Sequence, residues 1–231
     1  MHQFSYIFLW ITLTLWSCNG AAKREQQRQD SLARQDSIQK IERKKNRKTI
    51  LFLGNSLAAG FGLDNPEESA YPALIQKKLD AGNHNYRVVN AGVSGETTTG
   101  GRERINFLLK QKVDILVIEL GGNDGLRGVS PQVVKENLQQ IIDIARKRYK
   151  KIKVLLVRME APPNLGLDYT AGFTKAFDDL EEDNRKVVTV PFILDGIAGK
   201  PELNQSDGTH PTAEGHEVIA NKIWKYLQKV L

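Results

Sequence analysis

The feature that most constrains the fold is a set of five apolar runs, separated by longer amphipathic segments. The runs are continuous hydrophobic stretches and do not alternate strictly, which is typical of strands in a sheet covered on both faces. We therefore expect five buried strands. They are TILFLG (49–54), YRVVNAG (86–92), DILVIEL (114–120), KVLLVRM (153–159) and KVVTV (186–190).

The segments between the runs have the spacing of helices with one apolar face. Strands that alternate with helices imply parallel pairing through right-handed crossovers. The sequence thus predicts an α/β fold over residues 49–231, namely a three-layer α/β/α sandwich with a five-stranded parallel sheet. The clearest helical repeat is VVKENLQQIIDIARKR, whose apolar positions are Val134, Leu138, Ile141, Ile142 and Ala145.

The N-terminal segment predicts export. Residues 4–16 are almost all apolar, but they are fewer than the roughly 20 that a membrane-spanning helix needs. Their length suits the hydrophobic region of a secretory signal. Ser17 and Cys18 then follow in a stretch that resembles a bacterial lipobox, although Trp16 is bulky and the first residues lack Lys or Arg.

We accordingly expect a signal peptide over residues 1–17 and a lipidated Cys18, with the protein exported, anchored by its lipid in the bacterial cell envelope and facing the periplasm. The alternative is an ordinary signal peptide that contains a cysteine. Because Cys18 is the one cysteine of the chain, no intrachain disulfide can form.

The net charge of +6 belongs to the linker over residues 18–48. Between Lys23 and Lys48 there are ten Lys or Arg and four Asp or Glu, so residues 49–231 are neutral overall. The folded part therefore lacks the excess positive charge that is typical of nucleic-acid-binding domains. The composition of the linker predicts either a solvated helix or a disordered segment. Its role is either that of an inert spacer or that of a basic segment that lies on anionic lipid headgroups.

Polar residues follow three of the predicted strands and precede the last helix. In an open α/β sheet, binding sites form beyond the carboxyl ends of the strands, so these residues should meet. Each has a local alternative role, such as a helix cap for Ser56 or a tight turn for Gly95. The four groups are GNSL with Ser56, VSGETT with Gly95, GGNDG with Asn123 and Asp124, and SDGTHP with Asp207 and His210.

Taken together, these groups predict an acyl-transfer site. Ser56 needs a base, and of the four histidines only His210 has a carboxylate, Asp207, three residues before it in a loop. The candidate donors to a developing oxyanion are the backbone N–H groups of Ser56 and Gly95 and the side-chain amide of Asn123. No His, Cys and Asp cluster has the spacing of metal ligands, so we expect neither a metal nor an organic cofactor.

The order of these blocks resembles that of the SGNH (GDSL) hydrolases. VNAGVSGETT and ELGGNDGLRG look like the branch with thioesterase I, lysophospholipases and bacterial arylesterases, and the resemblance covers residues 49–231. It implies a flavodoxin-like fold, a Ser56 nucleophile with Asp207 and His210, and an oxyanion hole that includes Gly95 and Asn123. One departure is Asn55, where the family usually has Asp. We expect Asn55 to adjust the hydrogen bonds of its loop and to leave catalysis intact.

The implied activity is hydrolysis of carboxylic esters or thioesters, with aryl or short-to-medium acyl esters or lysophospholipids as substrates. We expect the stretch Ala161–Phe173 to line the acyl channel, and the protein to be a monomer that binds small acyl esters. The alternatives are an O-acetylesterase of carbohydrate or peptidoglycan in the same superfamily, and a lipoprotein that binds ligands without catalysis.

Overall fold

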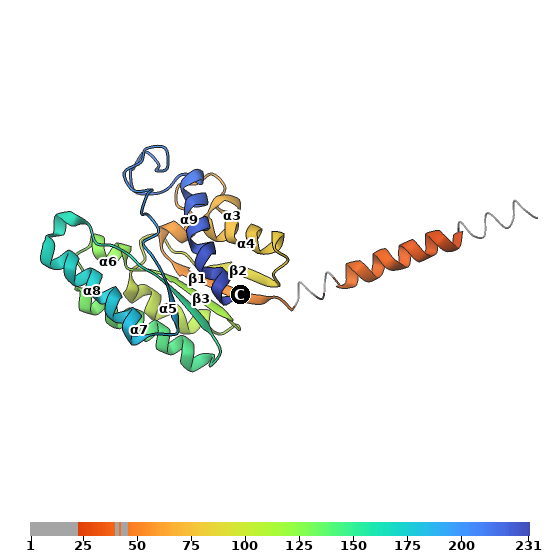
Figure 1. Ribbon diagram of the computed structural model, residues 1–231, viewed down its shortest axis with the longest axis horizontal. Helices are drawn as coiled ribbons and strands as arrows, with labels where there is room; N and C mark the ends of the chain where they lie inside the picture. The colour runs from red at the N-terminus through yellow and green to blue at the C-terminus, as the bar shows by residue number, and fades with distance from the viewer. Residues whose placement is uncertain (1–22, 40–41, 43–45) are drawn as a thin grey trace, which may run out of the picture. The chain divides into compact units, whose positions relative to one another are not determined.

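A computed structural model describes residues 23–39, 42 and 46–231, and the chain divides into two units, Met1–Arg47 and Lys48–Leu231. In the first unit, residues 23–39 are helical and exposed throughout, as the solvated-helix alternative predicts (Figure 1). The expected signal peptide and Cys18 lie outside the described residues. None of the described helices is long and apolar enough to cross a membrane.

The second unit is built on a five-stranded sheet in the order β2-β1-β3-β4-β5, in which every neighbouring pair is parallel (Figure 1). The predicted sheet is thus confirmed. In register, Ile50 of β1 lies between Val88 of β2 and Ile115 of β3. The strands are β1 (Lys48–Gly54), β2 (Tyr86–Asn90), β3 (Ile115–Glu119), β4 (Lys153–Val157) and β5 (Val187–Val190).

Helices cover both faces of the sheet, which confirms the three layers. One layer contains α4 and α9, which contact each other, and the other contains α5, α7 and α8, packed in that order. The helices are α2 (Ser56–Ala59), α3 (Pro66–Ser69), α4 (Tyr71–Ala81), α5 (Thr98–Leu108), α6 (Gly122–Leu126), α7 (Pro131–Arg148), α8 (Leu167–Asp183) and α9 (Ala213–Leu227), with short 3₁₀ turns η1 (Pro163–Leu165) and η2 (Gln228–Val230).

The apolar face predicted for α7 forms part of the core. Val134, Leu138, Ile141, Ile142 and Ala145 are all fully buried, and Pro131 begins the helix at a position where its missing N–H costs nothing. Because all five strands are parallel, their carboxyl ends lie at the same end of the sheet. The loops that follow β1, β2 and β3 therefore converge there.

Candidate active site

Ser56 begins the short helix α2 directly after β1. The helix is capped by the preceding residue, because the Asn55 side-chain oxygen accepts the backbone N–H of Leu57 at 2.9 Å. The suggestion that Ser56 itself caps this helix was therefore wrong. Its hydroxyl is left available for another partner.

That partner is His210, which comes from a loop 154 residues further along the chain. Its Nε2 lies 2.9 Å from Ser56 Oγ, and its Nδ1 lies 2.6 Å from Asp207 Oδ2. The structure thus brings the three predicted residues into one hydrogen-bonded chain. In such a chain the imidazole can take a proton from the hydroxyl while the carboxylate fixes its tautomer.

Asp207 is held as a carboxylate by the turn that it forms. Its Oδ1 accepts the backbone N–H groups of Thr209 and His210, both at 2.9 Å, while Oδ2 meets the His210 ring. The backbone and side-chain hydrogen bonds of His210, followed by that of Thr209, lower the pKa of Asp207 to about 2. Asp207 is therefore ionised at neutral pH.

Phe61 is a neighbour of the triad that the sequence did not reveal. Its ring is tilted against the His210 ring, with centroids 4.6 Å apart, and about half of the residue is exposed. The side chain of Gln205 donates to the carbonyl oxygens of Phe61 and Pro211, at 2.8 and 2.9 Å. These bonds link the loop after α2 to the loop that carries His210, and a lone aromatic in a loop offers no local signal of such a role.

Asn123 and Gly95 lie in the neighbouring loops, where they were predicted. Asn123 Nδ2 donates to the carbonyl of Glu96 at 3.0 Å, which leaves the second N–H of the amide for another acceptor. Gly95 has φ +80°, while an added Cβ would meet only Arg127, at 3.6 Å. The glycine is thus required by its backbone conformation.

Asp124 has a structural role beside Asn123. Its carboxylate accepts the backbone N–H of Thr98 at 2.9 Å and the Thr98 hydroxyl at 2.6 Å, at the start of α5. The pair ties the loop after β3 to the loop after β2. Asn123 and Gly95 are positioned by these two loops.

Beneath the Ser56 loop lies Glu119, a fully buried acid that the sequence analysis passed over. It accepts the backbone N–H of Asn55 at 3.3 Å and the hydroxyl of Tyr71 at 3.5 Å. Burial raises its pKa to about 8, against the lowering effect of these hydrogen bonds. The signal that could have found it is a charged residue within the apolar run 114–120.

His216 also lies in this buried layer and is not part of the triad. Its Nδ1 accepts the backbone N–H of Tyr71 at 3.2 Å, and the two rings stack at 6.2 Å. Burial, together with the nearby His210, lowers the pKa of His216 to about 4. It is therefore neutral at physiological pH and serves to join α9 to α4.

A cleft of about 220 Å³ opens at the triad and has mostly apolar walls. The stretch Ala161–Phe173 contributes only Pro162 to it, and Leu165 and Leu167 are exposed instead, so the expectation that this stretch lines the channel was largely wrong. The apolar lining residues are Leu57, Leu126, Met159, Pro162, Phe192 and Leu194.

The comparison with known proteins agrees with this site. Residues 52–218 match the GDSL-like Lipase/Acylhydrolase family. The esterase TesA of Pseudomonas aeruginosa is 38% identical over 79% of this chain and 89% of its own length, and the thioesterase 1/protease 1/lysophospholipase L1 of Escherichia coli K12 is 35% identical over 79% and 85%. A crystal structure of TesA superposes with a TM-score of 0.74 at 37% identity, covering 80% of this chain and 100% of that one.

The family match covers well over half of the chain and includes the β1 loop with Ser56 and the His210 loop. The similar relatives are esterases and thioesterases, and the structural match extends over nearly the whole second unit. The chain therefore belongs to the GDSL-like lipase/acylhydrolase family of serine ester hydrolases.

Proposed function

We propose that this chain hydrolyses carboxylic esters and thioesters through a covalent acyl-enzyme on Ser56. The observation that carries the proposal is the hydrogen-bonded chain from Ser56 through His210 to Asp207 at the mouth of a mostly apolar cleft. A serine hydroxyl is a weak nucleophile at neutral pH, and an adjacent base removes that limit.

In the acylation half-reaction, Ser56 Oγ attacks the carbonyl carbon while His210 Nε2 takes its proton. Asp207 stabilises the imidazolium that forms, because its carboxylate contacts Nδ1 at 2.6 Å. The tetrahedral intermediate then collapses, the bond to the alcohol or thiol breaks, and His210 returns the proton to the leaving group.

The negative charge on the carbonyl oxygen needs donors that are in place before the reaction. We assign this role to the backbone N–H of Ser56, which begins α2, the backbone N–H of Gly95, and the Asn123 amide. The hydrogen bond from Asn123 to the Glu96 carbonyl supports the assignment, because it fixes the amide in one orientation.

In the second half-reaction, water attacks the acyl-enzyme while His210 accepts one of its protons. The bond between Ser56 Oγ and the acyl carbon breaks, the carboxylic acid leaves, and the proton returns to Oγ. The chain supplies every group that these steps need.

The apolar walls of the cleft favour the binding of an acyl chain, whereas a sugar acetyl ester requires polar surroundings. We therefore propose short-to-medium acyl esters, aryl esters and thioesters as substrates. The names of the relatives, which include esterase, thioesterase and lysophospholipase, support this range. The O-acetylesterase alternative gains no specific support from the cleft.

The test is hydrolysis of p-nitrophenyl esters from acetate to palmitate by the wild type and by Ser56→Ala. We expect a rate maximum at short or medium chain length and a fall of more than 10³-fold in Ser56→Ala. A preference confined to acetate would favour the deacetylase alternative. A Ser56→Ala rate equal to that of the wild type would contradict the mechanism.

We further propose export and lipidation at Cys18, on the strength of the lipobox-like residues 15–18. Expression in a bacterium fed labelled palmitate tests this. The wild type should incorporate the label and Cys18→Ser should not. Cleavage and release of an unlabelled wild-type protein would indicate an ordinary signal peptide instead.

A further inference from the structure

The basic and acidic residues of the second unit are nearly equal in number, but they gather at opposite ends of the sheet. The connections that lead into β3, β4 and β5, at residues 109–114, 149–152 and 184–186, contain six Lys or Arg and one Asp. We call this end of the sheet, together with Lys48 at the start of β1, the strand-entry end. It carries a strong positive charge.

The opposite end, where the active site lies, has the reverse sign. The segments that leave the five strands contain seven Asp or Glu and three Lys or Arg, and they span residues 55–65, 91–97, 120–130, 158–166 and 191–212. The domain is therefore a dipole whose positive end faces away from the catalytic cleft.

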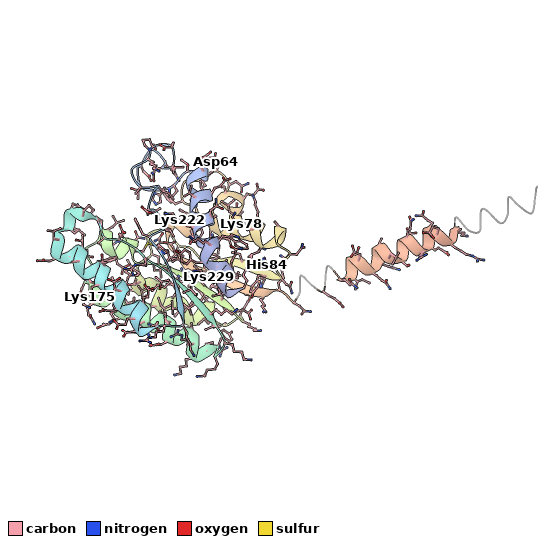
Figure 2. All side chains as sticks on the ribbon, in the orientation of Figure 1. Asp64, Lys78, His84, Lys175, Lys222 and Lys229 are labelled. Carbon is pink, nitrogen blue, oxygen red and sulfur yellow. The ribbon has the colours of Figure 1, made fainter. Side chains whose placement is uncertain are left out.

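The cations of the strand-entry end are exposed and available. Lys110, Lys150 and Lys151 are exposed and form no ion pair within the described part of the chain. The one acid of the three connections, Asp114, is already bound by Lys112 at 3.3 Å. Further cations lie near the ends of the helices, including Lys78 on α4 and Lys229 after α9 (Figure 2).

Helix dipoles explain only some of these cations. Basic residues in the last turn of a helix offset the partial negative charge there, as Lys78 does, but the effect falls off beyond that turn. Lys112, Lys150 and Lys151 lie in the connections after α5 and α7 have ended. The gathering of these exposed lysines at the strand-entry end thus needs a different explanation.

An exposed aromatic side chain lies among these cations. Phe107, at the end of α5, is 67% exposed, and Lys110 Nζ lies 5.0 Å from its ring centroid. Both residues line a groove that also contains Arg87 and Lys112 and has apolar walls from Leu51 and Val89, among others. An aromatic ring next to lysines is the composition of a surface that lies at a lipid–water interface.

We propose that the strand-entry end docks on an anionic lipid bilayer, with the lysines against the headgroups and Phe107 in the interface. The complementary charge favours this partner, and so does the direction of the chain: the basic segment 23–48 joins the domain at Lys48, on this same end. Docking this way leaves the catalytic cleft facing solution, so dissolved esters and thioesters reach it more readily than lipids of the same bilayer.

Vesicle sedimentation with residues 18–231, the expected mature chain, carrying Cys18→Ser tests the docking without the apolar residues 4–16, an acyl anchor or a catalytic readout. The vesicles are phosphatidylcholine with or without 30% phosphatidylglycerol. The test variant is Lys110→Gln/Lys150→Gln/Lys151→Gln. The control is Lys175→Gln/Lys200→Gln/Lys222→Gln, which removes the same charge from α8, from the loop after β5 and from α9, where Lys222 contacts Asp195 of that loop (Lys175 and Lys222 in Figure 2).

Each lysine near an anionic surface strengthens partitioning about fivefold, so we expect the test variant to bind phosphatidylglycerol vesicles about 100-fold more weakly and the control to change only slightly. Equal binding by the two triple variants would overturn the proposal and leave the linker as the source of affinity. The proposal would also be overturned if the test variant bound vesicles as well as the wild type but lost the ability of the wild type to bind an RNA oligonucleotide. That result would identify a nucleic-acid-binding surface.

The orientation is tested with single tryptophans in the same background, in which Trp224, the one tryptophan of residues 18–231, is replaced by Phe. Phe107→Trp should shift its emission to the blue on vesicle addition and be quenched by brominated lipid. Leu126→Trp, at the rim of the cleft, should show neither change. Quenching of Leu126→Trp alone would contradict the docking orientation, because it would place the cleft on the bilayer.

Discussion

The backbone N–H of Asn55 donates to the carboxyl group of Glu119 at 3.3 Å, so the residue before Ser56, the proposed nucleophile, is bound to a fully buried acid. Glu119 also lies against Gly54, where any added Cβ would come within 2.6 Å of its Oε2. Glu119 therefore contacts both the end of β1 and the residue that caps α2, and so helps to position Ser56.

Glu119 should make stability depend on pH. Its pKa rises from an ordinary value of 4.5 to about 8 in the folded protein, so between these values the folded state binds a proton that the unfolded state does not. The contribution of Glu119 to the free energy of unfolding should thus fall as pH rises from about 5 to 8. His216, whose pKa is lowered to about 4, has the opposite effect up to about pH 6.5, so the net fall is expected between pH 6.5 and 8. Melting temperatures across this range should decline less steeply in Glu119→Gln. A Glu217→Gln control, at an exposed position on α9, should follow the wild type, whereas a Glu119→Gln curve parallel to it would contradict the prediction.

Asn55→Asp should preserve the helix cap but place a second acid beside Glu119. The carboxylate can still accept the Leu57 N–H, while the amide donor to Glu119 is lost. We expect kcat at pH 7 to stay within about tenfold of the wild type and the melting temperature to fall more steeply above pH 7. Asn55→Ala removes the cap and should lower the free energy of unfolding by about 1 kcal/mol or more. A kcat loss near 10³-fold in Asn55→Asp would show that Asn55 has a direct part in the chemistry.

Asn123→Ala should lower kcat by about 10²–10³-fold with little change in KM, because an oxyanion donor acts mainly in the transition state. The same variant of Asn106, an exposed residue of α5, serves as the matched control and should keep the full rate. Steady-state hydrolysis of p-nitrophenyl butyrate measures both. An unchanged kcat in Asn123→Ala would remove this residue from the site.

Asp207→Asn should lower kcat by about 10⁴-fold, the loss known for this change in another Ser-His-Asp enzyme, because the amide favours the wrong imidazole tautomer. The hydrogen bonds that lower the pKa of Asp207 to about 2 also keep it ionised as the solution becomes acidic. The wild-type profile of kcat/KM should therefore show a single acid limb between pH 5 and 7, a range that excludes the ionisations of His216 and Glu119. A second acid limb in that range would contradict the assignment of Asp207.

The sequence predicted those parts of the fold and site whose signals are local or carried by motifs. Five apolar runs indicated five strands, and the spacing of Asp207 and His210 identified a turn that can hold an imidazole. Glu119 escaped notice because its burial depends on β1 and α4 packing over it. Phe61 and the cleft walls depend on where loops meet, and the charge segregation appears only once the parallel strands place their connections at opposite ends.

The central claim is that Ser56 carries the acyl group, and a covalent label tests it most directly. The protein is incubated with a fluorophosphonate, and peptide mass spectrometry then locates the adduct. We expect one adduct per chain on the peptide that contains Ser56, and none in Ser56→Ala at the same concentration. A wild-type protein that hydrolyses esters yet stays unlabelled, or bears its adduct on another residue, would contradict the account.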